Sequence, residues 1–512
     1  MYLHRNAFRA IAAIAVIVAV VASLTACGTS SDSAASGSVV KWAVIIPPNW
    51  DPVQTSSHYP QYYTSLVYEP ILAITPDGKP APGLAESWQF NPAGTELTLK
   101  LRQGNKFTDG TPVDGEAVKD FFNRALTDGQ SARKVDFESI QSVTADSEST
   151  VTLHLKRPDF GILLRLGPKA GQVPSPAVSP EDLKQNPVGA GPYKVTEFVD
   201  GDHVFLDKNP DYWDAANIHV DRIEFYPKPA PAQAVASLTS GQYDLVNAID
   251  TGSQRSAEGV PGVKIFSPAG NNNWYINLNL ARAPFNDPQV VKAFNLGINR
   301  EEFIAKAGDG IGDPSTQPYR QGEVGYVAAF DKLEYDPEKA KTVLAAAGYA
   351  PGAIDITIPI SPDNQRQAEV LQSQLQAIGI TATIQVMQDD AISKLAFTKS
   401  KEYPLLLSGT HNYLDPLETF SQQFSAKGNV NLSGLQPADF DTLLYAAAAT
   451  PLDSPKYESA VAALANSSLA FGSKVYLYTY HYSYLQSTKI SDFPRTPGSV
   501  SWKGVTVSPG TA

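Results

Sequence analysis

The chain of 512 residues is long enough to bury a large core, and its length predicts two or three domains of roughly 150 residues each. Its formal net charge of −12 at pH 7 repels nucleic acid and anionic lipid head groups, and no basic cluster in the sequence offsets that charge. We therefore expect no nucleic-acid partner.

Residues 1–26 have the layout of a secretory signal. Arg5 and Arg9 precede an uncharged apolar run that ends near residue 21 and is too short for a comfortable membrane span. The run leads into "LTAC", which resembles the lipobox of bacterial lipoproteins, where the cysteine is acylated and becomes the new N-terminus. The resemblance implies that Cys27, the only cysteine of the chain, anchors a lipid. The alternative is a secreted protein with a free thiol.

Residues 27–38 follow as a run of small and polar residues, and they predict a flexible tether because they have little to bury. Loss of the signal removes two arginines and no acid, which moves the formal charge to −14. With no second cysteine, the mature protein holds together without an intramolecular disulfide.

Two segments of the first third alternate apolar with polar residues and predict half-buried antiparallel strands. The alternating apolar residues are Leu97, Leu99 and Leu101 in one segment and Val151, Leu153 and Leu155 in the other. Between them, Asp114 is placed to cap a helix. The predicted buried face of that helix carries Val118, Phe121, Phe122 and Ala125.

The second half predicts helices with clear ends. Asp287 and Asp336 are candidate N-caps, and each is followed by a proline, Pro288 or Pro337, at the first helical position. Gly348 marks the end of the second helix.

Strand-like residues 353–360 and 380–387 flank a helix-like segment at 364–379. Strands that alternate with helices in this way predict an α/β fold with right-handed crossovers.

Five phrases in the same order resemble the solute-binding proteins of ABC importers in the oligopeptide, dipeptide and nickel class. They are "NWDPVQTSSHYPQYYTSLVYEPIL", "PGLAESWQFNPAGTELTLKLRQGNKFTDGTPVDGEAVKDFFNRAL", "NPVGAGPYKVTEFVDGDHVFLDKNPDYWD", "PFNDPQVVKAFNLGINREEFI" and "YDPEKAKTVLAAAGY". The likeness runs from about Trp42 to the C-terminus.

The resemblance implies an α/β periplasmic-binding-protein fold of type II, of the large peptide-binding class, whose two lobes close on a ligand about a hinge. Binding energy shifts the balance between open and closed forms, and the membrane permease then reads the closed form. Such a cycle needs no cofactor and no resident metal, and we expect a monomer.

The same likeness implies how the chain divides. The first lobe takes residues 39–270, with a subdomain inserted at about residues 70–180, and the returning residues 485–512. The second lobe takes residues 271–484. Two extended aromatic segments, 271–279 and 476–486, are expected to cross between the lobes and to form a hinge floor that also touches the ligand.

In this family, ligand-binding groups lie on the loop after the first strand, on the hinge strands and on a second-lobe segment that ends in Asp-Pro. The matching residues here are Ser57, His58 and Tyr59 on the loop; Trp274, Asn277, Tyr480 and His481 on the hinge strands; and Thr410, His411, Asn412, Tyr413 and Asp415 on the Asp-Pro segment.

Peptide-binding members commonly carry an aspartate a few residues before this Asp-Pro pair, and it binds the amino group of the ligand. This chain has His411, Asn412 and Tyr413 there. A buried ammonium without a carboxylate costs several kcal/mol, so a peptide has no evident anchor unless Asp415 reaches the cleft. Asp415 can instead cap a helix that starts at Pro416. A peptide remains the ligand that the family resemblance implies. The missing aspartate makes a neutral polar ligand or an anionic chelate a stronger alternative.

His58, His411 and His481 lie on three segments that could meet at the cleft, which suits a metal chelate or an acidic group. Each histidine alone is equally explained by packing or by surface exposure, and no close His/Cys spacing predicts a bare-metal site. Strict alternation places a row of tyrosines on one strand face, either packed on helices or partly facing the ligand. The row is Tyr476, Tyr478, Tyr480, Tyr482 and Tyr484.

An enzyme is not expected, because the sequence has no nucleophile-elbow motif and no HExxH motif, and its scattered acids are those of an acidic surface. We expect a lipid-anchored protein on the extracellular face of the bacterial cytoplasmic membrane. It captures a peptide or peptide-like solute and delivers it to an ABC permease. The alternatives are a binding protein for a non-peptide solute, such as a metal chelate or an oligosaccharide, and a ligand sensor.

Overall fold

The computed structural model describes residues 37–55, 58–247, 251–267, 272–332, 334–388, 391–392, 394–395, 402–480, 483–496 and 499–508, without the side chains at 58–62, 410–411, 495–496 and 499. The predicted signal, Cys27 and most of the predicted tether lie outside these residues. Val39–Ala512 forms one compact unit. Within the described part, no helix has both the length and the apolar character needed to cross a membrane.

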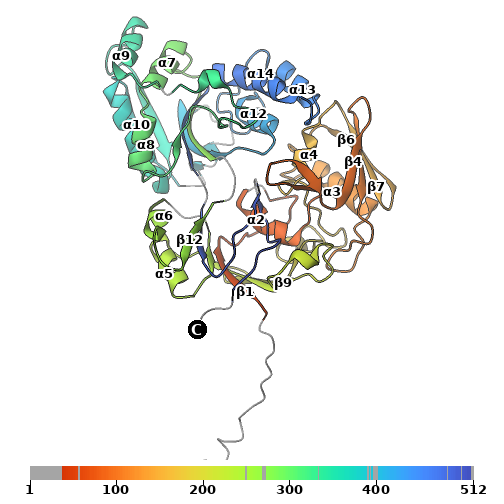
Figure 1. Cartoon of the computed structure of the whole chain (residues 1–512). Coiled ribbons are helices and arrows are strands. Elements are labelled where there is room, and N and C mark those ends of the chain that lie inside the picture. Colours follow the sequence, from red (N-terminus) through yellow and green to blue (C-terminus); the bar gives the residue numbers. More distant parts are fainter. Residues whose placement is uncertain are drawn as a thin grey trace, which may run out of the picture. The chain divides into compact units, whose positions relative to one another are not determined.

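A seven-stranded sheet joins early segments of the chain to a late one (Figure 1). Its strands, in order across the sheet, are β12 (Val263–Phe266), β19 (Tyr484–Ser487), β11 (Leu245–Val246), β1 (Val39–Val44), β10 (Arg222–Pro227), β9 (His203–Lys208) and β8 (Tyr193–Val199). Strand β1 is parallel to β10 and β11, and the other neighbours are antiparallel. The late strand β19 thus completes a sheet begun by the N-terminal part.

Both faces of this sheet are covered, which explains the apolar run that forms β1. Trp42 points to an aromatic core with Tyr63 of α2 (His58–Val67), and the two ring centroids lie 5.4 Å apart. Ala43 points the other way, to a smaller core with α5 (Ala234–Thr239) and α6 (Thr251–Ala257). Successive residues of a strand face opposite sides, so one segment contributes to two cores.

The two alternating segments form antiparallel strands as predicted, and they pair with each other. They are β5 (Glu96–Leu101) and β7 (Thr150–Leu155), in a sheet with β4 (Ala85–Phe90) and β6 (Ile140–Ser147). Helix α3 (Gly115–Thr127) follows its predicted cap, because Oδ1 of Asp114 accepts the backbone N–H of Ala117 at 2.9 Å. Its predicted face is buried, including both phenylalanines.

A second four-stranded sheet is antiparallel throughout and carries a core on each face. Its order is β14 (Asp313–Pro314), β18 (Lys474–Tyr480), β13 (Asn272–Leu278) and β17 (Leu405–His411). One core includes α7 (Pro288–Leu296), α8 (Arg300–Ala307), α9 (Pro337–Ala346) and α10 (Gln365–Ala377). The other includes α12 (Pro416–Phe424), α13 (Phe440–Ala448) and α14 (Tyr457–Ala470).

The predicted ends of α7 and α9 are confirmed. Asp287 and Asp336 accept backbone N–H groups at 2.8 Å, and Gly348 takes a φ of +88° two residues past the end of α9. The predicted strand–helix–strand unit is also confirmed, since β15 (Asp355–Ile360) and β16 (Thr381–Val386) are parallel and joined through α10.

The shorter elements connect these layers. They are β2 (Leu72–Ile74), β3 (Pro80–Pro82), α4 (Ile162–Arg165), β20 (Arg495–Thr496), β21 (Ser499–Val500), and the 3-10 turns η1 (Asp182–Lys184), η2 (Ala215–Asn217), η3 (Pro231–Gln233), η4 (Ala328–Phe330) and η5 (Pro362–Asn364).

The predicted single row of tyrosines is wrong. The pairing of β13 with β18 shifts between Trp274 and Tyr275, so the register passes over Leu477 and strict alternation stops there. Tyr476 consequently packs among the α12–α14 core, whereas Tyr478 packs among the α7–α10 core. Tyr484 lies in the other sheet altogether, on β19. Tyr482 lies outside the described residues.

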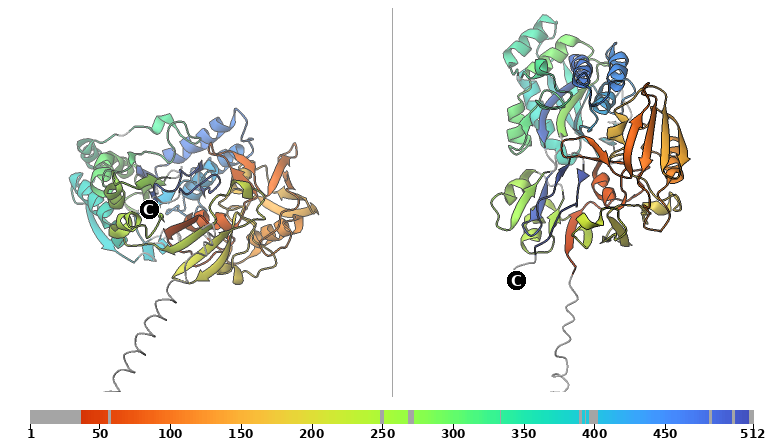
Figure 2. Two further views of the ribbon diagram at one scale, coloured as in Figure 1. Left: turned by 60° about the horizontal axis from the view of Figure 1, so that its bottom comes forward. Right: turned by 45° about the vertical axis from the view of Figure 1, so that its right-hand side comes forward.

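The chain passes twice between the seven-stranded sheet and the β14-β18-β13-β17 sheet. It leaves β12 for β13 and returns from β18 to β19 (Figure 2). The first passage directly precedes the segment 271–279 expected at the hinge, and the second lies within the segment 476–486. The lobe boundaries themselves, and the inserted subdomain, stay predictions.

Candidate functional site

Three strand ends meet where the second sheet approaches both passages. Asn272, the first residue of β13, is in register with His411, the last of β17, and with Tyr480, the last of β18. Trp274 lies two residues further along β13. The structure thus brings together candidates that are far apart in sequence, and the row marks the candidate site.

Trp274 and Tyr480 form an aromatic pair at this edge. Their ring centroids lie 6.2 Å apart at 40°, and both side chains are half-buried. Gly409 on β17 leaves room for them, because a Cβ there would come within 2.9 Å of the Tyr480 hydroxyl oxygen. The pair offers apolar area together with a hydroxyl and an indole N–H, a combination suited to a polar organic solute.

Asn412 is held by the protein on the opposite side of the sheet. Its Nδ2 donates to the carbonyl oxygen of Pro318, which also accepts Nδ2 of Asn273 at 3.2 Å. Nε2 of Gln423 donates to Oδ1 of Asn412 at 3.4 Å. The amide of Asn412 therefore positions the segment rather than being free for a solute.

Tyr413 is fixed in the same way. Its backbone N–H donates to Oγ1 of Thr419 at 2.8 Å, and its carbonyl oxygen accepts the hydroxyl of Tyr319 at 3.1 Å. Nζ of Lys169 lies 3.9 Å from the centre of its ring, and burial raises the pKa of its hydroxyl. Tyr413 thus packs against a cation of the protein itself.

Asp415 caps α12, as the helix-capping interpretation predicted. Its Oδ1 accepts the backbone N–H of Leu417 at 2.9 Å, and its Oδ2 accepts Nη1 of Arg165. The residue is 2% exposed, and burial raises the pKa of its carboxyl against the lowering effect of Arg165. Both oxygens are engaged by the protein, so this geometry does not favour Asp415 as an anchor for a ligand ammonium.

Asn277 is not brought to the site. It lies five residues along β13 from the row and is 3% exposed, and its Nδ2 donates to the carbonyl oxygen of Val430 at 2.8 Å. Five residues of strand span about 17 Å, which separates this amide from the cleft edge. Its assignment as a ligand contact is therefore corrected to a packing role at the far end of the strand.

The remaining candidates are placed only by their backbone or not at all. Thr410 and His411 end β17, and His58 and Tyr59 begin α2, but their side chains lie outside the description. Ser57 and His481 lie outside the described residues. The expected convergence of the three histidines therefore stays a prediction.

Sequence reasoning missed the charged residues that surround Asp415. Arg165 binds both Asp159 and Asp415, while Lys169 binds Asp136 and Glu418. Asp415 and Glu418 lie about 250 residues from the cations that bind them, so no local spacing connects these two pairs. The only available signal was the presence of cations in an apolar context just after "GILL".

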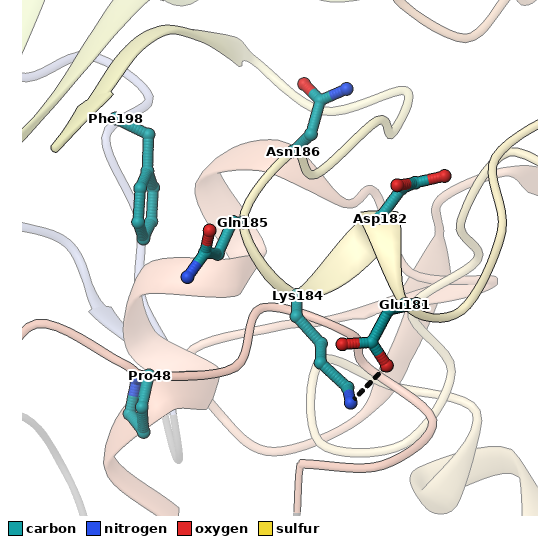
Figure 3. Close-up of a pocket in the computed structure, with 7 residues that line it drawn as sticks. All are labelled: Pro48, Glu181, Asp182, Lys184, Gln185, Asn186 and Phe198. Atoms are coloured by element: carbon teal, nitrogen blue, oxygen red, sulfur yellow. Dashed lines mark hydrogen bonds and ion pairs between the residues drawn. The ribbon is translucent and has the colours of Figure 1, made fainter. Parts of the chain in front are cut away.

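A separate hollow of about 490 Å³ lies beside β8 and η1 (Figure 3). Its lining is Pro48, Glu181, Asp182, Lys184, Gln185, Asn186 and Phe198, and Lys184 pairs with Glu181 at 2.6 Å. None of the predicted ligand contacts lines it, so we do not assign it to solute capture. Among the described residues, no group of His, Cys, Asp or Glu side chains is arranged to hold a metal ion.

Comparison with known proteins decides the family. The family described as "Bacterial extracellular solute-binding proteins, family 5 Middle" matches residues 79–431. The chain belongs to this family. Among curated relatives, it is 28% identical over 358 residues to the glutathione-binding protein GsiB of Escherichia coli (strain K12), and the match covers 69% of each chain. Membership identifies an extracellular solute-binding protein and not an enzyme.

Solved structures share the fold of this solute-binding protein. The agropinic-acid complex of AgaA from A. tumefacien R10 superposes with a TM-score of 0.80 at 22% identity, covering 92% of this chain and 99% of that one. DppA from Helicobacter pylori, in complex with the peptide STSA, gives the same TM-score and identity over 92% and 98% of the two chains. The fold is the two-lobed α/β periplasmic-binding-protein fold expected from the sequence.

Proposed function

We propose that this protein is a lipid-anchored receptor that captures a peptide or peptide-like solute between two lobes and hands it to the permease of an ABC importer. The observation that carries the proposal is the family match, which spans most of the folded part. The row of Asn272, His411 and Tyr480 supports it, because three strand ends meet beside both passages of the chain.

We infer that the lobes divide as the sequence predicts, with the seven-stranded sheet in lobe I and the sheet of β13, β17 and β18 in lobe II. Lobe I comprises residues 39–270 and 485–512, with the insertion at about 70–180, and lobe II comprises residues 271–484. The membership of β19 in the first sheet supports the division, because it returns the C-terminal part to lobe I.

Two solute classes fit. A peptide is supported by the relatives, since GsiB is named for glutathione and DppA was solved with a tetrapeptide. A non-peptide organic acid is the second candidate, because AgaA was solved with agropinic acid. The positions of His411, Asn412 and Tyr413 carry no acid, and the carboxylate of Asp415 is engaged by Arg165, which favours solutes that do not depend on a buried ammonium.

Anchoring through Cys27 places the receptor on the extracellular face of the cytoplasmic membrane, as a monomer that needs no cofactor. The family description as extracellular agrees with this location. A protein that senses its solute without feeding a permease would look the same, and genes for a permease and an ATPase beside this one would distinguish the two roles.

Native mass spectrometry of protein purified from its own host tests the proposal by weighing the solute it retains. Calorimetry with glutathione, with short peptides and with the recovered solute then gives affinities. Trp274→Ala is expected to weaken binding about 5- to 150-fold, because about 1–3 kcal/mol of aromatic contact is lost. Trp88→Ala on β4 is the matched control. Equal affinities in the two variants would contradict the proposed site.

A further inference from the structure

Lobe I and lobe II meet at a charged contact away from the aromatic edge. Arg165, at the end of α4, binds Asp415, the N-cap of α12, and Lys169, just after α4, binds Glu418 in the first turn of α12. In Figure 1, α4 lies beside α12 and α13. The backbone N–H of Phe160 donates to the carbonyl oxygen of Ala448 at 2.9 Å, which extends the contact to the end of α13.

The contact is largely buried and rich in charge. Within the described part of the chain it holds three cations and four carboxylates: Arg133, Arg165, Lys169, Asp136, Asp159, Asp415 and Glu418. The four carboxylate residues are at most 8% exposed. Burying so many charges is favourable only when they face each other, because each loses its hydration.

We propose that these seven residues form a charge clasp that holds the two lobes closed independently of the solute. The inference rests on the lobe movement of the proposed function and goes beyond it, since none of the seven residues belongs to the row of strand ends that marks the candidate site. Opening the lobes separates Arg165 from Asp415 and Lys169 from Glu418, while Asp159 and Asp136 remain with their cations in lobe I. The lobe II carboxylates then return to water.

The clasp also couples closure to protons. Three positive and four negative groups leave one negative charge uncompensated when the lobes close. Glu418 carries it, because burial raises the pKa of this carboxyl to about 7, with Lys169 opposing. The groups that face Glu418 are Lys169, Arg165, Asp136, Asp415 and Tyr413.

The sign of the pH effect follows from these states. In the open form Glu418 is hydrated, with an ordinary pKa of about 4.3, so the closed form binds the proton more tightly. Closure therefore strengthens as the pH falls from about 8 to about 5. Burial also raises the pKa of Asp415, which acts in the same direction, whereas the lowered pKa of Asp136 acts only below this range.

Distances between spin labels on the two lobes test the clasp. Cys27→Ser removes the only cysteine, so Glu148→Cys in the β6–β7 turn and Glu458→Cys on α14 can be labelled uniquely. Without added solute, we expect the closed-to-open ratio to rise about thirtyfold between pH 8 and pH 5.5, because Glu418 takes up a proton below its closed-form pKa of about 7.

Three variants separate the clasp from its surroundings. Glu418→Gln is expected to raise the closed population at pH 8 and to flatten the pH dependence, since it removes the uncompensated charge. Arg165→Met is expected to lower the closed population. Glu338→Gln removes an exposed carboxylate on α9 that pairs with Lys341 at 2.8 Å, and it should behave like the parent. If Arg165→Met does not fold, Glu418→Gln decides alone.

Two results would overturn the clasp. If added glutathione shifts the distances but neither pH nor Glu418→Gln does, closure is driven by solute alone and the clasp is wrong while the proposed function stands. If one distance persists under every condition, with or without solute, both the clasp and the lobe movement are wrong.

Discussion

Asp415 divides its two carboxylate oxygens between a helix and a distant arginine. Oδ1 caps α12 through the N–H of Leu417, and Oδ2 accepts the guanidinium of Arg165, a residue 250 positions earlier in the chain. One side chain therefore sets both the start of α12 and its attachment to α4. Asp415, which the family resemblance offered as a ligand anchor, instead caps α12 and pairs with Arg165 of α4.

Asp415→Asn separates these two roles, because asparagine also caps a helix but carries no charge. We expect the free energy of unfolding to fall by about 2–3 kcal/mol, less than the roughly 3–5 kcal/mol of a fully broken buried pair, because Arg165 keeps Asp159. Chemical denaturation measures the loss. Asp336→Asn at the half-buried cap of α9 should change stability by about 0.5 kcal/mol at most, and equal losses in both variants would show that only capping matters.

Lys474, the first residue of β18, is 8% exposed. Among its described contacts, its Nζ donates to the carbonyl oxygen of Val430 at 2.6 Å and lies 4.8 Å from the centre of the Tyr275 ring. Burial lowers the pKa of this lysine well below its ordinary value. The unfolded chain then binds the proton more tightly, so stability contributed by this site rises with pH between the folded and the unfolded pKa. We expect Lys474→Met to stabilise the protein at pH 7 and to remove that rise.

Unfolding curves measured from pH 6 to pH 10 check this prediction as a difference between variant and parent. Lys341→Met, at an exposed position on α9, is the matched control and should leave the pH dependence unchanged. A Lys474→Met protein that is less stable than the parent at pH 7 would show that the hydrogen bond to Val430 outweighs the cost of burying the charge.

Peptides are expected to bind without a strong contribution from their amino group. Losing one partner of a buried ammonium–carboxylate pair costs about 3–5 kcal/mol, which lowers the affinity by two to three decades or more. Since His411, Asn412 and Tyr413 offer no acid, N-acetylation of a bound peptide should change its affinity less than tenfold. Calorimetry on paired free and acetylated peptides decides this, and submicromolar binding abolished by acetylation would reveal an acid that replaces the missing one.

Solute is expected to make the protein more compact, because closing two lobes on a ligand brings their masses together. Small-angle scattering should give a smaller radius of gyration at saturation than without solute. The comparison is best made at pH 8, where the clasp leaves the largest open population. An unchanged profile at pH 8, with solute binding confirmed by calorimetry, would contradict solute-driven closure.

Cys27→Ser is expected to release the protein from membranes or to leave an uncleaved precursor, because serine offers no thiol for acylation. Cell fractionation followed by mass measurement of the N-terminus distinguishes these two results from lipid anchoring. A processed Cys27→Ser protein that stays with the membrane would contradict the anchor.

Local patterns in the sequence were enough for most individual elements. The alternation of Leu97, Leu99 and Leu101 gave β5, and aspartates before prolines gave the starts of α7 and α9, because strand periodicity and helix capping depend on neighbours within four residues. The family phrases were enough for the fold class. Alternation failed at Tyr478, where a β-bulge reverses the face, since a bulge depends on the partner strand rather than on the sequence of one strand.

The sequence by itself determined the helix and strand segments, the α/β fold class and the family of solute-binding proteins to which the chain belongs. Only the tertiary structure decided which candidates share a site: it joined Trp274 with Tyr480 at three strand ends, buried Asn277 at the far end of its strand and paired Asp415 with Arg165. The physical reason is range, because capping and periodicity act between close neighbours, whereas burial and ion pairing join residues hundreds of positions apart.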